Sequence, residues 1–459
     1  MNPELQRRIW TDLTPRRLGF LALVLLILFG AAFLVAPRGD KLSALGALAS
    51  VVFFLVVVLW GCRNAGESMA EDIRDRTWDL QRLSALSAWE LTWGKLVGST
   101  LFVWFGGLIC LVPIAINYVI NGVPTIGDEG PRVTGIGVAF TTTLMIFLSA
   151  IAAQSGALFA VLLAARRQAA AARWSLVLGV GAGLFVWYLT EAARTLIQFS
   201  ATDEGSTSMN WWGIAIPTHL FALFSLIVLC FWLIAGCWRL MRRAVQLRPQ
   251  LVWWLGFLAF ACLYAAGFAW TDNAVAQSIP ALIFLIGGVV AGGVAFFTAL
   301  IEPKDRSVLR RAATAVEQGH FIEAVRDVPA FIWPTGIAKV AMFVGSLLVL
   351  SLPLGEVDGT PFQIPLAFLF FLLRDIGIIL FFCLGSKPGS GEFPALVTIA
   401  LLYGVGGIIG ASSEVADLMA FFVPSDDASV WVTILAPLAQ AAIMWFLALR
   451  RFWVIRKAA

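Results

Sequence analysis

Charge is scarce in this sequence. Only 13% of its 459 residues are Asp, Glu, Lys or Arg, whereas a soluble domain carries roughly 25%. Apolar residues make up 60% of the chain, and its mean hydropathy is +0.88. There is too little polar surface to coat even one soluble domain, and the same figures exclude disorder, collagen and coiled coil. The class that remains is an all-α polytopic membrane protein.

Motifs for metal binding, cross-linking and catalysis are absent from the sequence as well. Its six cysteines form no CxxC pair and fall inside or beside apolar runs, so we expect neither a disulfide frame nor a zinc site. The two histidines, His219 and His320, are too far apart in sequence to suggest a metal or general-base site. Gly94-Lys95 lacks the upstream glycine of a P-loop and is followed by Leu96. We therefore expect no enzyme activity, no metal and no cofactor, and any ATP must be bound by a partner.

Twelve apolar runs are long enough to cross a bilayer, for which about 20 residues are needed. The first run is too long and uninterrupted for a cleaved signal peptide. The predicted spans are 18–36, 42–62, 96–119, 136–165, 174–190, 213–237, 251–270, 279–301, 336–354, 364–384, 395–411 and 430–449.

The placement of Lys and Arg predicts the orientation of these spans. With the N-terminus inside, the basic residues gather in the cytoplasmic segments, and the external loops hold only Arg38, Lys41, Arg132 and Arg194. The external loops are acidic, with Asp128, Glu129, Asp203, Glu204, Glu356, Asp358, Asp426 and Asp427. This alternation persists to the C-terminus, so we expect both termini in the cytoplasm. The basic segments then lie beside anionic lipid, and no nucleic-acid partner is expected.

The chain divides near Pro249 into two halves in which short and long loops follow in the same order. Each half, 1–250 and 251–459, holds six predicted spans and a short first external loop. A long charged cytoplasmic segment follows the second span of each half, at 63–95 and 302–335. Because an even number of spans separates the halves, both start inside, which predicts a parallel duplication about an axis along the membrane normal.

The segment after the second span carries the most specific pattern. Residues 67–82 are charged and compatible with an amphipathic helix, which predicts a helix on the cytoplasmic surface. Ser87-Ala-Trp-Glu90 has the spacing of a capping box, so a new helix is expected to begin at Ser87 and to run through Gly94-Lys95 into the third span.

This segment resembles the ABC-2 type permeases, the membrane subunits of ATP-binding-cassette exporters. Those proteins have an acidic, arginine-containing helix after the second span, a Gly-Thr-Leu-Glu-like turn, a small-residue stretch and a Gly-Lys at the third span. Here Arg76-Thr77-Trp78-Asp79-Leu80 stands at the turn, 83–87 at the stretch and Gly94-Lys95-Leu96 at the third span. Asp79 replaces the usual Glu, the usual proline near Leu86 is absent, and the second half departs from the motif.

The resemblance implies a six-span permease unit at 1–250, with a second, degenerate unit at 251–459. It also implies a multi-pass protein of the plasma (bacterial inner) membrane and a cytoplasmic ABC ATPase, as a dimer, as partner. The ATPase would press on a stiff coupling segment at 63–95. The residues expected to couple the permease to the ATPase are Glu67, Asp72, Arg74, Asp75, Arg76, Asp79, Arg82 and Lys95.

One pair of charges falls within a predicted span. Arg374-Asp375 lies in the middle of the tenth run, where a charge costs about 2.5–3.5 kcal/mol on insertion scales. Neighbours on a helix point about 100° apart, so we expect each side chain to face the bundle interior without forming an ideal pair with the other. The two residues are candidates for a pathway or gate, or else for a structural polar cluster.

Two other functional classes fit the span count. An ion-gradient-driven secondary transporter can also have twelve spans in two halves, although few ionisable groups lie within the spans here. A membrane-embedded lipid-modifying enzyme would need a catalytic constellation, which the sequence does not show. For an ATP-driven permease we expect alternating access to a mostly apolar cleft that suits a hydrophobic or amphiphilic substrate.

Overall fold

The computed structural model describes most of the chain. The described residues are 2–37, 39–84, 86–123, 135–165, 168–202, 208–247, 251–270, 278–302, 314, 318–319, 330–351, 363–385, 391–412, 416–425 and 428–457. The eight acidic residues assigned to external loops, His320 and most of the segment 302–335 lie outside these ranges.

The prediction of an all-α polytopic membrane protein is confirmed. Helices dominate the structure, and twelve of them are long and apolar enough to span a membrane. The chain divides into two compact units, 1–209 with 215–250 and 210–214 with 251–459, and each unit holds six of the twelve helices.

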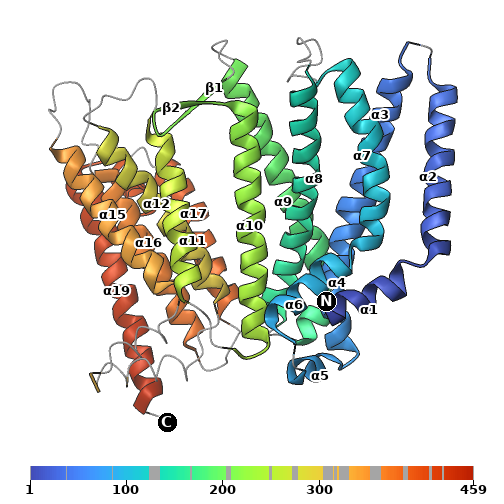
Figure 1. Ribbon diagram of the computed structural model, residues 1–459. Helices are drawn as coiled ribbons and strands as arrows, with labels where there is room; N and C mark the ends of the chain where they lie inside the picture. Colours follow the sequence, from blue (N-terminus) through green and yellow to red (C-terminus); the bar gives the residue numbers. More distant parts are fainter. Residues whose placement is uncertain are drawn as a thin grey trace. The chain divides into compact units, whose positions relative to one another are not determined.

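Unit 1 contains the first six spans (Figure 1). Its helical elements are α1 (Pro3–Asp12), α2 (Pro15–Val35), α3 (Lys41–Phe53), η1 (Phe54–Trp60), α4 (Gly61–Arg74), α5 (Trp78–Leu83), α6 (Ala88–Trp93), η2 (Gly94–Gly98), α7 (Leu101–Asn121), α8 (Ile136–Ala164), α9 (Gln168–Thr202) and α10 (Thr218–Ala244). A two-stranded sheet of β1 (Ser208–Trp211) and β2 (Ile214–Pro217) precedes α10. The predicted span 213–237 is therefore wrong at its start, because residues 214–217 are extended.

Unit 2 contains the last six spans. Its elements are α11 (Leu251–Ala266), η3 (Gly267–Ala269), α12 (Ile279–Ile301), α15 (Ile332–Leu350), α16 (Gln363–Cys383), α17 (Glu392–Ser412), α18 (Ala416–Met419) and α19 (Val430–Lys457).

The spans of the two units have the same neighbours. The second span packs along the third in both, α3 on α7 and α12 on α15, and the sixth packs along the fourth, α10 on α8 and α19 on α16. The first span lies on the second, as α2 on α3 and α11 on α12. Unit 1 adds one extensive contact, between α4 and α9. This shared packing order is what a duplicated six-helix unit would have.

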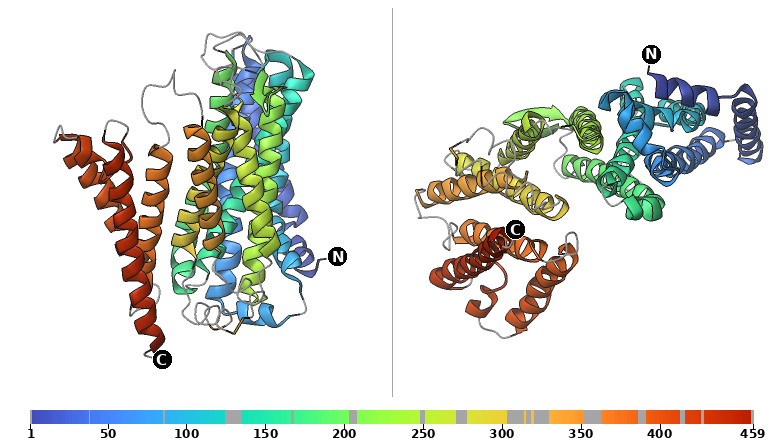
Figure 2. Two further views of the ribbon diagram at one scale, coloured as in Figure 1. Left: turned by 90° about the vertical axis from the view of Figure 1, so that its left-hand side faces the viewer. Right: turned by 90° about the horizontal axis from the view of Figure 1, so that it is seen from below.

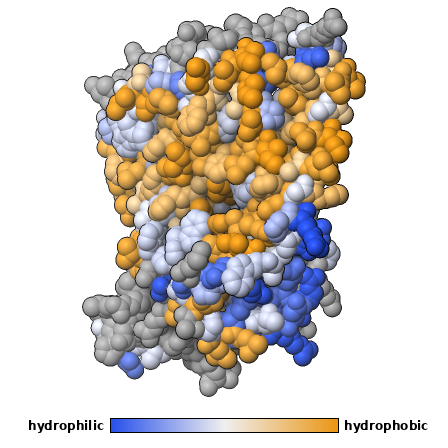
Figure 3. Space-filling model, turned by 45° about the vertical axis from the view of Figure 1, so that its right-hand side comes forward, coloured by the Kyte–Doolittle hydropathy of each residue, from blue (hydrophilic) through white to orange (hydrophobic). Residues whose placement is uncertain are grey.

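Apolar side chains cover the middle of the face shown in Figure 3, and hydrophilic ones gather toward its lower end. In unit 1 that end holds α1, α5 and α6 (Figure 1), and we call it the polar end. The helix α2 stands at the rim of unit 1 (dark blue in Figure 2), where only 6% of its most apolar window is buried. Such exposure of apolar side chains suits contact with lipid.

The second span is longer than predicted, and the expected surface helix over 67–82 is wrong. Helical structure continues from Lys41 to Arg74, and α5 is a separate short helix. The reason is packing: α4 is buried against α8 and α9, with Gly66 in backbone contact with Gly179. The small residues Ala65, Gly66, Ser68 and Ala70 are the signal in the sequence for this burial.

A π-helical segment, η1, lies within the second span. A glutamine of α8 forms a hydrogen bond with one of its backbone carbonyls. The Gln154 amide donates from Nε2 to the carbonyl of Val57 at 2.9 Å. Its Oε1 accepts a hydrogen bond from Trp104 Nε1, also at 2.9 Å. Gly61 leaves the space for this amide, because a Cβ there would collide with it. A backbone group away from water needs such a partner, so Gln154 fixes the π-segment against α7 and α8.

We predict that Gln154→Leu destabilises the protein, because the Val57 carbonyl and the Trp104 indole N–H would both lose their partner. The expected loss is about 1–3 kcal/mol, measured as a lowered midpoint of thermal unfolding in detergent. Thr141→Val is the control, because that hydroxyl bonds only to carbonyls of its own helix. Equal midpoints for Gln154→Leu and wild type would contradict the role given to Gln154.

Candidate functional site

The segment between the second and third spans is built around a buried ion pair. Lys95 is completely buried, and its Nζ donates to the carboxylate of Asp72 and to the carbonyl of Ser68 at 3.2 Å. The Nζ also lies 5.8 Å from the centre of the Trp78 ring. Burial lowers the pKa of Lys95 and the Asp72 carboxylate opposes this shift. The pair ties the end of α4 to η2 through two residues that are 23 positions apart in the sequence.

The turn at the end of α4 places the partner of Lys95. Arg76 has φ 59°, the left-handed conformation that usually follows a helix and favours glycine. The amide of Arg76 donates to Ile73 O at 3.3 Å, and that of Thr77 donates to Asp72 O at 3.0 Å, which is the Schellman pattern. The Thr77 hydroxyl also lies 3.2 Å from Asp72 Oδ1. Backbone and side chain of Asp72 are thereby both held at this turn.

The charges beyond this turn are exposed. Arg74, Asp75, Arg76 and Asp79 are exposed, and Asp79 forms an ion pair with Arg82 at 3.2 Å within α5. The coupling residues chosen from the sequence therefore fall into an inner and an outer group. Asp72 and Lys95 form the inner ion pair, whereas Arg74, Asp75, Arg76, Asp79 and Arg82 lie around the turn and α5; we call this outer group the coupling face.

Glu67 belongs to neither group. It lies almost two helical turns before the end of α4 and pairs with Arg63 at 3.2 Å. The sequence pattern predicted that Glu67 lies on a surface helix. Because α4 continues the second span instead, Glu67 lies apart from the coupling face.

The capping box at Ser87 is confirmed. The amide of Glu90 donates to Ser87 Oγ at 3.2 Å, and the amide of Ser87 donates to Glu90 Oε2 at 2.8 Å. The Ser87 amide and the Ser87 hydroxyl both donate to the Glu90 carboxylate, each at 2.8 Å, and these two bonds lower the pKa of Glu90. The helix begins as predicted, but π-helical η2 follows α6, and the hydroxyls of Ser99 and Thr100 bond to the carbonyls of Lys95 and Leu96.

Two contacts of this segment were not predicted. The first is with α1, which packs on η2 across Gly94 and Gly98. A Cβ at Gly94 would lie 2.5 Å from Glu4 Cγ, and one at Gly98 would lie 3.2 Å from Arg8 Cγ. The spacing Gly94-Lys-Leu-Val-Gly98 is the small-residue pattern of close helix pairs and could have revealed this contact.

The second contact is with the sixth span. Trp89 of α6 packs edge to face with Trp93 at 5.4 Å and with Trp238 of α10 at 6.4 Å between ring centroids. The segment after the second span thus contacts the second, third and sixth spans of unit 1.

In unit 2, Arg374 and Asp375 of α16 are buried at 2% and 5% exposure and do bond to each other. Arg374 Nε and Nη2 each lie 2.9 Å from the same oxygen, Asp375 Oδ1. The long arginine side chain folds back over the carboxylate and reaches only one of its oxygens, which agrees with the expectation that these buried neighbours form no ideal pair. The two-oxygen fork of an ideal pair is still not formed.

Two further residues complete this cluster. Tyr403 of α17 donates its hydroxyl to Asp375 Oδ2 at 2.8 Å, and Arg374 Nη1 donates to Gln440 Oε1 of α19 at 3.0 Å. Gln440 in turn donates to the carbonyl of Phe421 at 2.9 Å. The sequence gives a weak signal for Tyr403, one of only four tyrosines in the chain. The cluster joins three spans of unit 2.

Comparison with known proteins yields no match: no family model, no curated protein and no solved structure matches the chain.

We predict that Lys95→Met destabilises the protein by about 3–5 kcal/mol, because it leaves the Asp72 carboxylate buried without its counterion. Replacing both partners, in Asp72→Leu/Lys95→Met, should recover much of this loss. Arg82→Met breaks the exposed pair with Asp79 and should cost at most about 1 kcal/mol. Unfolding midpoints in detergent measure all three variants. A double variant as unstable as Lys95→Met would show that the pair itself is not what stabilises the turn.

For unit 2, Arg374→Ala should lower the free energy of unfolding by about 3–5 kcal/mol, since Asp375 would be buried without a counterion. Tyr403→Phe removes one hydrogen bond to the same carboxylate and should cost about 1–3 kcal/mol. Thermal unfolding of the purified variants tests both values. Wild-type stability in Arg374→Ala would argue against a structural cluster and would favour a role of Arg374 in a pathway or gate.

Proposed function

We propose that this chain is the permease of an ATP-driven transporter, with the ATPase supplied by a separate cytoplasmic protein that docks on the coupling face. One observation carries the proposal: exposed charges of both signs surround a rigid turn that is anchored to two spans by a buried ion pair. An ordinary solvated loop needs no such anchoring. The polar end of unit 1 is then the cytoplasmic end, in agreement with the distribution of Lys and Arg.

The contacts of the turn provide a path for force. A push on the coupling face acts on α4, which is continuous with the second span. The Asp72–Lys95 pair passes the push to η2 and so to the third span. The ring contact between Trp89 and Trp238 adds the sixth span. Displacement of the turn would therefore move three helices together.

Three further points support this reading. The sequence has no P-loop, so the energy of ATP must come from a partner. The shared packing order of the two units fits one chain that supplies both halves of a central pathway. The sequence resemblance to ABC-2 permeases covers the same turn. The proposed direction of transport, export, rests on that resemblance.

Ion-gradient-driven transport is the second candidate, and the buried carboxylate of Asp375 is the observation that favours it. An ion-coupled transporter needs a carboxylate that can release and bind its ion. Both oxygens of Asp375 already contact Arg374 or Tyr403, an arrangement that suits a structural role better.

We predict that the double charge reversal Asp75→Arg/Arg76→Glu separates the chain from its ATPase. The tagged chain is purified from its native membranes in mild detergent, and vanadate-sensitive ATP hydrolysis in the eluate is measured. Reversal should reduce this activity at least about tenfold, because like charges across an interface cost several kcal/mol.

Asp40→Arg is the matched control, because Asp40 is exposed and lies at the opposite end of the second span, beside the start of α3. It should leave the co-purified activity unchanged. Equal unfolding midpoints for both variants exclude misfolding as the cause. Substrate transport by the purified chain alone, driven by an ion gradient, would refute the proposal and favour the second candidate.

A further inference from the structure

A cavity of about 430 Å³ lies in unit 1 among α1, α2, α4 and the start of α7. Four charged side chains line it: Arg8, Arg17, Glu67 and Glu71. Trp60 and Phe102 add an aromatic wall, with their ring centroids 5.9 Å apart. Neither the coupling face nor the Asp72–Lys95 pair forms part of this cavity.

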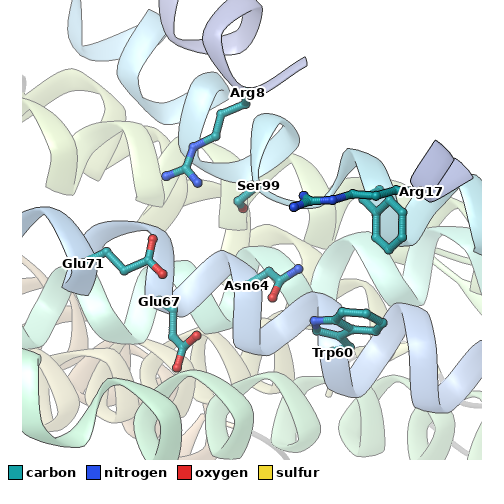
Figure 4. A pocket seen from close by; sticks show the side chains of 8 residues that line it. Arg8, Arg17, Trp60, Asn64, Glu67, Glu71 and Ser99 are labelled. Carbon is teal, nitrogen blue, oxygen red and sulfur yellow. The ribbon is translucent and has the colours of Figure 1, made fainter. Parts of the chain in front are cut away.

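The charges of opposite sign lie on different sides of the cavity. Arg8 and Arg17 come from α1 and α2, whereas Glu67 and Glu71 come from α4 (Figure 4). In the described part of the chain, no ion pair links these arginines to these carboxylates. The cavity therefore separates two cations from two anions, of which Glu67 also pairs with Arg63 of its own helix at 3.2 Å.

Several of these groups have unused bonding capacity. Arg8 Nε is buried without a hydrogen bond within the described ranges and lies 3.6 Å from a carboxylate oxygen of Glu4. Arg17 makes one long hydrogen bond, 3.5 Å to the carbonyl of Thr11. The carboxylate of Glu71 has no bonding partner among the described residues. A ligand that carries both charges would satisfy both sides.

The cavity lies where the apolar part of unit 1 meets its polar end. The helical stretch from Lys41 to Arg74 has 34 residues and is about 50 Å long at 1.5 Å per residue, whereas the hydrocarbon core is about 30 Å thick. Its last turns, with Glu67 and Glu71, thus extend beyond the core. Trp60, at 43% exposure, stands about two turns deeper, at the depth that tryptophan favours in membranes.

We propose that this cavity binds the headgroup of a zwitterionic phospholipid with a primary amine, as in phosphatidylethanolamine. The phosphate would lie between Arg8 and Arg17, because guanidinium groups bind phosphate oxygens through paired N–H donors. The ammonium would donate to Glu67 and Glu71, and the glycerol and upper acyl chains would contact Trp60 and Phe102. A purely anionic headgroup would bring no cation to the carboxylate of Glu71, and a quaternary amine offers no N–H.

This lipid site requires only that the chain resides in a membrane, so it stands independently of the ATP-driven mechanism. The bound headgroup would bridge α1 and α2 to α4, next to the turn that carries the coupling face.

The test is a lipid titration of the full-length chain in detergent, followed by native mass spectrometry. The probes are phosphatidylethanolamine, phosphatidylglycerol and phosphatidylcholine with the same acyl chains, and soluble glycerophosphoethanolamine. We expect phosphatidylethanolamine to bind at least about tenfold more tightly than the other two lipids, the difference that one charge-assisted hydrogen bond makes. Equal binding of the three lipids would overturn the proposal. Binding of the soluble headgroup as tight as that of the lipid would overturn the membrane source of the ligand.

Two charge-removing variants separate the two sides of the cavity. Glu71→Gln should remove the preference for phosphatidylethanolamine over phosphatidylglycerol, whereas Arg17→Gln should weaken the binding of every phospholipid. Arg16→Gln is the matched control, because Arg16 is exposed beside Arg17 and does not line the cavity. An equal loss in Arg16→Gln would indicate non-specific attraction and refute the site.

A third variant tests the cavity without changing charge. Asn64→Phe places a bulky ring in the cavity wall and should reduce phosphatidylethanolamine binding at least about tenfold. Its unfolding midpoint without lipid, compared with wild type, shows whether the fold survives. Undiminished binding in a folded Asn64→Phe variant would overturn the assignment of the ligand to this cavity.

Discussion

A fully buried lysine must keep its counterion, and unit 1 is arranged around that requirement. Lys95 cannot reach water, so the carboxylate of Asp72 has to stay within hydrogen-bonding distance. The left-handed residue at Arg76, the hydroxyl of Thr77 and the ring of Trp78 all keep that carboxylate and its surroundings in place. Because separating the charges in a dry site is expensive, α4 and η2 behave as one body even though the helices α5 and α6 lie between them in the sequence.

A second constraint is the absence of water along the spans, which forces every irregular stretch of backbone to find a protein partner. The chain meets this requirement locally. At η1 a glutamine from a neighbouring helix bonds the carbonyl of Val57. At η2 the hydroxyls of Ser99 and Thr100, which follow in sequence, bond carbonyls of the π-segment itself. In unit 2 the indole of Trp445 and the guanidinium of Arg451 also bond carbonyls of a neighbouring span, α16, although that helix is regular.

The sequence was informative where a local rule sets the structure. Hydropathy found the twelve spans because bilayer thickness fixes their length, and the spacing of Ser87 and Glu90 found the start of α6 because a capping box involves only four residues. The sequence misled where distant contacts decide. Burial of Gly66 against Gly179 carried the second span on to Arg74, and no local pattern identified Asp72 as the partner of Lys95. Tyr403 and Gln440 join Arg374 and Asp375 only through the packing of α17 and α19 on α16.

The packing of α1 has a consequence for biogenesis. Its first turn is tied to residues nearly a hundred positions later, through Glu4 against Gly94 and through the Asn2 side chain, which donates to the carbonyl of Glu90 at 2.6 Å. A ribosome releases α1 well before Gly98 has been translated, so α1 has to wait without its partner while the first two spans insert. Its amphipathic sequence allows it to rest on the membrane surface in that interval. Docking of α1 would then mark the moment at which the third span has entered the bilayer in the correct orientation.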